Sequence, residues 1–160
     1  MKRVIILLFT VAVFLFSCNS PSDALFRYTL GSGNTFRETN QVNFYYNATD
    51  SSANLIAVFA NTDTFHLMWV TPFISTKSNY LFGDVYGLDS DIMVVKIEDT
   101  QSTSPYIGLD MFKSGSLTVT HFDEAHISGQ FDFNANTVNP ITLSTAILNF
   151  NGSFDGIDVQ

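Results

Sequence analysis

The chain of 160 residues has a single cysteine, Cys18. A framework of intramolecular disulfides is therefore excluded, and stability must come from an ordinary hydrophobic core. A chain of about 150 residues buries roughly 68–70% of its unfolded surface, so one domain is enough to form such a core. The sequence predicts one domain without covalent cross-links.

Positive charge is scarce. Seven Lys and Arg residues stand against fifteen Asp and Glu, a formal net charge of −8. Without Lys2 and Arg3, which belong to the segment discussed below, five basic residues face the fifteen acidic ones and the net charge becomes −10. Binding to nucleic acid requires Lys and Arg to neutralise phosphates, so this function is excluded. Anionic membrane surfaces also repel such a domain.

Sequence motifs for catalysis and for cofactors are missing. The chain has no G-x-S-x-G elbow, and the glycines at 31 and 33 lack the helix and lysine of a phosphate-binding loop. Acidic residues are plentiful, but nothing in their spacing selects a catalytic pair. We therefore expect neither an enzyme nor a resident cofactor.

The first eighteen residues are the most informative. Lys2 and Arg3 precede thirteen uncharged residues, 4–16, and Cys18 follows directly after Ser17. This run is shorter than the roughly 20 residues of a membrane span but suits a secretory signal. The segment resembles the lipobox of bacterial lipoproteins, which implies lipidation (palmitate among the acyl groups) at Cys18 and a cell-envelope location, in the inner or the outer membrane. The expected organisation is a signal peptide over 1–17, a lipidated cysteine and tether over 18–24, and one β domain over 25–160.

The rest of the chain shows period-two alternation of apolar and polar residues. Examples lie at 42–47, 117–120, 127–133 and 148–154, between clusters of Gly, Asn, Asp and Ser. Residues 55–59 and 65–70 are apolar on both faces, which predicts strands covered on both sides, and 61–63 reads as the turn between them. Eight to ten predicted strands, with no predicted helix, indicate an all-β fold, a single antiparallel β-sandwich or small β-barrel.

Two C-terminal segments carry a family resemblance. Residues 115–120 read Gly-Ser-Leu-Thr-Val-Thr, and residues 126–135 read His-Ile-Ser-Gly-Gln-Phe-Asp-Phe-Asn-Ala. Together with the Gly-Ser-Phe ending at 152–154, this hairpin resembles one found in small Bacteroidota cell-envelope lipoproteins with a C-terminal all-β domain of unknown function. The resemblance implies an all-β envelope lipoprotein and brings no catalytic residues. Within the hairpin, Gly129 lies on the face of Phe131, where a glycine lets an aromatic ring cross the strand.

Two acidic regions offer weak metal candidates. His121, Glu124 and His126, with Asp123 between them, have zinc-type side chains, and the loop containing Asp89 and Asp91 has calcium-type oxygens. Turns are rich in acidic residues for conformational reasons, and the loop lacks the spacing of a dedicated calcium site. We expect solvated turns and no metal in both.

Aromatic residues are the remaining candidates for a binding site. Tyr45, Tyr80 and Tyr86 are expected to be exposed and to face a ligand, since exposed rings on a β fold can form a binding platform. The sequence therefore favours a non-catalytic binding or structural module of the envelope, anchored to the membrane through Cys18, with an envelope protein or a glycan as its partner. The alternative is a carrier of small hydrophobic ligands, with residues 55–59 and 65–70 lining a barrel cavity.

Overall fold

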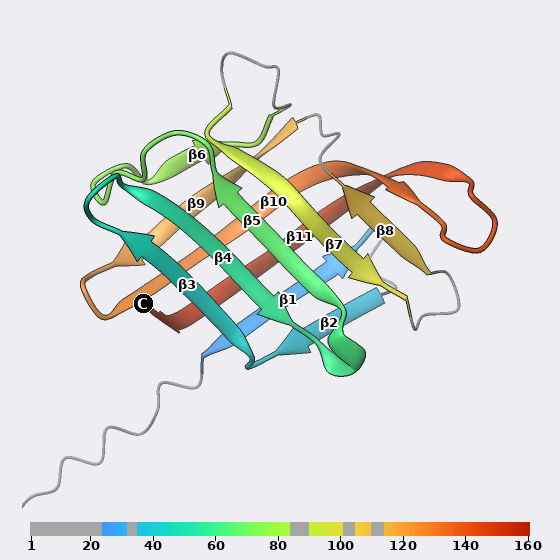
Figure 1. Cartoon of the computed structure of the whole chain (residues 1–160), viewed down its shortest axis with the longest axis horizontal. Coiled ribbons are helices and arrows are strands. Elements are labelled where there is room, and N and C mark those ends of the chain that lie inside the picture. Colours follow the sequence, from blue (N-terminus) through green and yellow to red (C-terminus); the bar gives the residue numbers. More distant parts are fainter. Residues whose placement is uncertain (1–23, 32–34, 84–89, 101–104, 110–113) are drawn as a thin grey trace, which may run out of the picture.

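The computed structural model describes residues 24–31, 35–83, 90–100, 105–109 and 114–160 (Figure 1). The predicted signal peptide (residues 1–17), Cys18, Tyr86 and Asp89 lie outside these residues. The described part contains eleven strands and one short 3₁₀ turn, η1 (Ala60–Thr62). The strands are β1 (Leu25–Leu30), β2 (Thr35–Thr39), β3 (Val42–Asn47), β4 (Ser52–Val58), β5 (Thr64–Trp69), β6 (Asn79–Leu81), β7 (Ile92–Asp99), β8 (Tyr106–Leu109), β9 (Ser114–Phe122), β10 (His126–Val138) and β11 (Thr145–Asp158).

The strands form one antiparallel sheet that is nearly closed into a barrel, so the predicted fold class is confirmed. The main path runs β2-β1-β11-β10-β8-β7-β5-β4-β3, and β9 pairs with both β10 and β6. At the seam, Gln160 donates its N–H to Phe44 O at 2.9 Å and accepts the N–H of Tyr46 at 2.9 Å. Figure 1 shows β3, β4, β5 and β7 crossing in front of β1, β9, β10 and β11.

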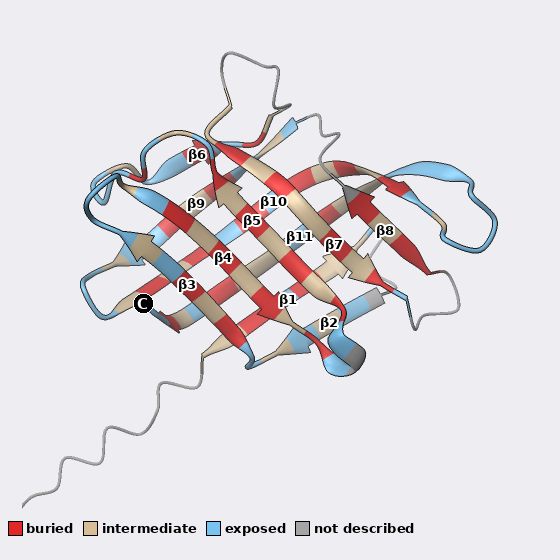
Figure 2. Ribbon diagram, viewed as in Figure 1, coloured by how far each residue is buried: buried red, intermediate tan, exposed pale blue. Residues whose placement is uncertain are grey.

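Alternation along the strands fills the space between these two layers with aromatic rings. The inward rows of β1, β5, β10 and β11 place Phe26, Phe65, Phe131 and Phe150 at 0–2% exposure. Phe26 and Phe65 have ring centroids 4.8 Å apart, and Phe65 and Phe131 are 5.3 Å apart. Such aromatic pairs add roughly 0.5–1.5 kcal/mol each beyond the burial of their area. The alternating bands of buried and half-buried residues are visible in Figure 2.

Two expectations about individual strands need correction. The outer rows of β4 and β5 are only half-buried at Ile56 and Met68, and Val70 just beyond β5 is 43% exposed, so these strands are not covered on both sides. A barrel wall has one inward face, and neighbouring outward apolar side chains shield each other only in part. The sequence also missed two short strands, β2 and β6. Within the residues that the structure describes, no helix has the length and apolar content to cross a bilayer.

Candidate functional site

A polar groove crosses the outer face of β9, β10, β11, β1 and β2. It consists of two adjoining hollows of about 430 and 210 Å³, which share Gln130, Asn151 and Gly152. The register of the strands explains which residues line the groove. It places outward-facing residues of five neighbouring strands of the sheet in two rows. One row is Thr118, Gln130, Ser153, Arg27 and Glu38, and the other is Ser116, Asp132, Asn151, Thr29 and Phe36.

Short hydrogen bonds hold most polar side chains of the groove in place. Arg27 Nε donates to Ser153 Oγ at 2.9 Å, and Asn151 Nδ2 donates to Asp132 Oδ2 at 3.1 Å. Asn149 Nδ2 donates to the other oxygen of the same carboxylate at 2.9 Å. These bonds leave the remaining lone pairs and N–H groups of the two rows directed outward, where they are preorganised for a ligand.

Gln130 differs from its neighbours. Its side chain is exposed, and among the described residues its amide has no hydrogen-bond partner. An amide offers both a donor and an acceptor, so Gln130 can bond a hydroxyl in either direction. At one end of the groove Phe36 is 54% exposed and presents an apolar ring. The groove therefore combines a side-chain amide that is available to bond a ligand with one exposed aromatic ring.

A smaller cleft of about 180 Å³ lies at one end of the barrel and is lined by charged residues. Arg37 forms an ion pair with Asp99, whose side chain is 3% exposed. Asp63 accepts hydrogen bonds from the Thr100 N–H at 3.0 Å and the Thr100 hydroxyl at 2.7 Å. Both carboxylates thus have partners within the fold, which fits a role in closing the barrel end.

A buried tyrosine pair lies beside this cleft. The hydroxyls of Tyr28 and Tyr106 are 2.9 Å apart, and both residues are at most 3% exposed. Burial raises the pKa of Tyr28 to about 12 despite the opposing hydrogen bond from Tyr106. Burial likewise raises the pKa of Tyr106. Both phenols are therefore neutral at physiological pH.

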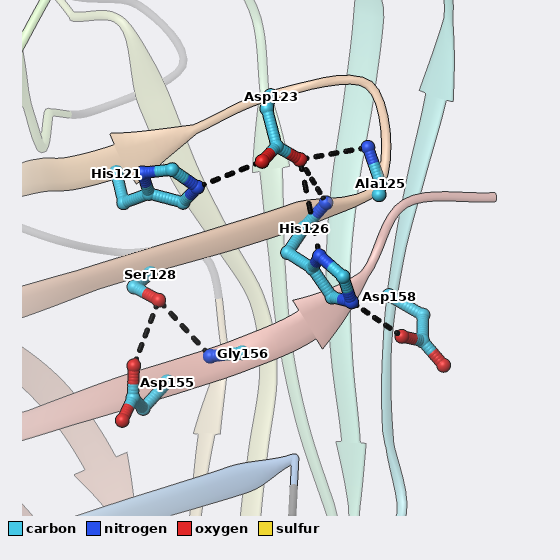
Figure 3. A network of polar contacts seen from close by, with 8 residues as sticks. All are labelled: His121, Asp123, Ala125, His126, Ser128, Asp155, Gly156 and Asp158. Carbon is cyan, nitrogen blue, oxygen red and sulfur yellow. Dashed lines mark hydrogen bonds and ion pairs between the residues drawn. The ribbon is translucent and has the colours of Figure 1, made fainter. Parts of the chain in front are cut away.

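The β9–β10 hairpin brings together the histidines named from the sequence (Figure 3). His121 Nε2 lies 3.0 Å from Asp123 Oδ2, while His126 Nδ1 lies 3.9 Å from Asp123 Oδ1 and its Nε2 lies 3.6 Å from Asp158. Backbone N–H groups of His126 and Ala125 bond the Asp123 carboxylate and, with His121, lower its pKa to about 2.

This arrangement is a turn built around one carboxylate. The two imidazoles contact Asp123 from different sides, and His126 also turns toward a second acid. Glu124 is exposed at the tip of the turn. Across the described residues, no group of three or more His, Cys, Asp or Glu side chains is arranged to hold a metal ion.

Asp91, the described member of the second acidic region, is held by protein donors. Its carboxylate accepts bonds from Lys77 Nζ at 2.6 Å, Thr71 Oγ1 at 3.0 Å and the Leu81 N–H at 2.9 Å. Burial works to raise the pKa of Asp91, but these three donors outweigh it and the pKa lies below its usual range. Asp91 ties β6 to the start of β7. Its neighbour Asp89 lies outside the described residues.

The three tyrosines expected at the surface have different outcomes. Tyr45 is 42% exposed on the outer face of β3, as predicted, but it does not line the groove. The expectation for Tyr80 is wrong, because this residue is the inward-facing centre of β6 and is fully buried. Its hydroxyl donates to Ile74 O at 2.7 Å, and its ring stacks on Phe73 at 5.6 Å. Tyr86 lies outside the described residues.

Sequence reasoning did not single out the groove residues, although a signal for them exists. Gln130 and Asp132 occupy the polar positions of one alternating run, and Asn149, Asn151 and Ser153 occupy those of another. Two adjacent antiparallel strands with amide-rich outer rows indicate a shared polar surface. Phe36 had no such signal, because its strand was not predicted.

Comparison of the chain with protein-family models, with curated proteins and with solved structures finds no match.

Proposed function

We propose that the protein is a lipid-anchored envelope lipoprotein whose β domain is a non-catalytic binding module for neutral glycans. The observation that carries this proposal is the pair of outward rows on β9, β10, β11, β1 and β2, which form a continuous groove of amide, hydroxyl, guanidinium and carboxylate groups. In this proposal the signal segment directs export and is removed, and the acyl groups on Cys18 provide the anchor.

The chemistry of the groove suits sugars better than apolar ligands. Sugar hydroxyls both donate and accept hydrogen bonds, as do the side chains of Gln130 and Asn151. Phe36, at the end of the groove, offers an apolar surface for the C–H face of a sugar ring. The larger hollow has the size of a small-molecule site, about 300–1,000 Å³. A chain with a net charge of −8 repels anionic polysaccharides, which favours neutral ones.

The carrier alternative has less support. The inward side chains of β4 and β5, which would line its cavity, are fully or almost fully buried at Leu55, Phe65 and Leu67. Phe65 alone has four Phe ring centroids within 6.4 Å: those of Phe26, Phe131, Phe133 and Phe150. Rings packed this closely leave little room for a hydrophobic ligand between them.

The test is Gln130→Ala, with Gln41→Ala as a matched control. Both glutamines are exposed, and neither side-chain amide has a partner among the described residues, so both variants should keep the stability of the parent chain. Binding of the full chain to immobilised neutral polysaccharides (glucans, mannans and xylans) should weaken by about 5- to 30-fold for Gln130→Ala, the equivalent of one hydrogen bond of about 1–2 kcal/mol.

Gln41→Ala should bind like the parent chain. Equal loss in both variants, or the absence of binding to every neutral polysaccharide by the parent chain, would contradict the proposal. Binding of an envelope protein that Gln130→Ala abolishes would assign the groove to a protein partner instead.

A further inference from the structure

The hairpin that joins β10 and β11 carries the most exposed apolar side chains of the described chain. Ile141 is 78% exposed, Leu143 is 74% exposed and Ile147 is 63% exposed. Figure 1 shows this hairpin extending beyond the barrel at one end of its long axis, and Figure 2 shows it as a continuous exposed segment. Large aliphatic side chains gathered on a projecting tip mark an interaction surface.

The same hairpin has no charge. Residues 133–154 contain no Asp, Glu, Lys, Arg or His, although the chain has fifteen acidic residues. The flanking charged residues are Asp132 and Asp155, both well back along the strands from the tip. This stretch of the acidic protein can therefore enter an apolar medium without desolvating a charge.

The backbone donors of the tip are bonded within the turn itself. Asn139 Oδ1 accepts the N–H groups of Ile141 and Thr142, both at 2.9 Å, and Asn139 O accepts that of Leu143 at 2.8 Å. Asn139 N donates to Ser144 O at 2.9 Å, and Ser144 N faces Thr142 Oγ1 at 3.5 Å. Residue 140 is proline and has no N–H. Internal satisfaction of backbone donors is what hydrocarbon requires of a polypeptide.

We infer that this hairpin tip, with Ile141, Leu143 and Ile147, inserts into the boundary between the headgroups and acyl chains of a lipid bilayer. A hairpin that lies tilted in this boundary can bury apolar side chains on its turn and on the adjoining strand at a depth of about 5–10 Å. A second copy of the chain fits less well, because a narrow turn cannot supply the roughly 800 Å² per partner of a stable interface. The negative charge of both copies also opposes their approach.

The tip is a second membrane contact, separate from the proposed anchor. Leu25, where the described barrel begins, pairs with Asp155, ten residues along β11 from Thr145. At about 3.3 Å per residue, Leu25 therefore lies roughly 33 Å from the end of β11 that joins the hairpin tip. Tip insertion and an anchor at Cys18 would together hold the long axis of the barrel along the membrane surface.

The experiment places an environment-sensitive fluorophore (NBD) on a cysteine introduced at Leu143→Cys in the full chain, reconstituted in uncharged phosphatidylcholine vesicles. The matched control is Glu124→Cys, an exposed position at the tip of the β9–β10 hairpin. The label at 143 should emit at shorter wavelength, resist quenching by aqueous iodide and be quenched by bromine-labelled acyl chains. The label at 124 should show the opposite behaviour.

The double substitution Ile141→Ser with Ile147→Ser should lower the equilibrium constant for insertion of the tip by at least about tenfold, since two largely exposed aliphatic side chains are lost. The label at 143 should then be more accessible to water. Equal iodide quenching at 143 and 124 would overturn the inference. A label at 143 shielded from both quenchers would assign the tip to a protein contact and also overturn it. The chain without an introduced cysteine tests the anchor separately: if it takes up the fluorophore, Cys18 is not lipidated, while the difference between 143 and 124 still decides the role of the tip.

Discussion

The ring of Phe154 on β11 lies across Gly129 on β10. A Cβ atom added to Gly129 would come within 2.5 Å of Phe154 Cζ and 2.6 Å of Thr118 O. The same relationship recurs two pairs along the strands, where a Cβ on Gly152 would lie 2.5 Å from Phe131 Cζ. Each glycine is the cross-strand partner of the ring concerned, so two aromatic rings cover two glycines at the centre of the barrel.

Gly129→Ala should therefore destabilise the fold by about 1–3 kcal/mol, because backbone on one side and a packed ring on the other leave no room for a methyl group. Gly108→Ala is the matched control: it is also a buried strand glycine, but its nearest neighbours to an added Cβ are 3.5 and 3.6 Å away. Denaturant unfolding of both variants measures the difference. A cost for Gly108→Ala equal to that for Gly129→Ala would contradict the packing described here.

The buried phenols predict the behaviour of the protein in alkali. Burial raises the pKa of Tyr28 to about 12 and raises the pKa values of Tyr80 and Tyr106, whereas an unfolded tyrosine ionises near 10. Their contribution to stability is complete below pH 10 and is lost as the pH rises through the folded-state values. Absorbance at 295 nm should show three tyrosines ionising late, together with loss of the near-ultraviolet circular dichroism. Ionisation of all tyrosines near pH 10 in a still-folded protein would contradict their burial.

The β9–β10 turn predicts an acid dependence. Backbone N–H groups of His126 and Ala125, together with His121, lower the pKa of Asp123 to about 2. Because the folded pKa is depressed, its contribution is present above the unfolded value near 3.9 and is lost as the pH falls toward 2. Asp123→Asn should reduce the loss of stability between pH 5 and pH 2, measured by urea unfolding. An acid profile of Asp123→Asn that matches the profile of the parent chain would count against the account.

The sequence predicted those parts of the fold in which apolar and polar residues alternate along the whole length of a strand. Residues 127–133 alternate without interruption, so their strand, their inward row and the ring over Gly129 all followed from local pattern. Tyr80 shows the limit of such reasoning. Its strand has three residues, and its burial depends on pairing with Leu117, which local pattern does not record.

The candidate groove illustrates the same limit. Its polar rows are readable on β10 and β11, but Arg27 and Phe36 join them only through the register of β1 and β2. Register between strands more than a hundred residues apart depends on the whole sheet. The backbone bonds of Gln160 to β3 at the seam of the nearly closed barrel are likewise not predicted by any short-range pattern.

The account as a whole depends on the lipid anchor, since the envelope location and the orientation of the groove and the tip at a membrane follow from it. Mass spectrometry of the intact protein from the membrane fraction of an exporting bacterium tests it most directly. We predict a chain that begins at Cys18 and carries the added mass of acyl groups, and a Cys18→Ala variant that carries none. A membrane-derived chain that still begins at Met1, with an unmodified Cys18, would contradict the account.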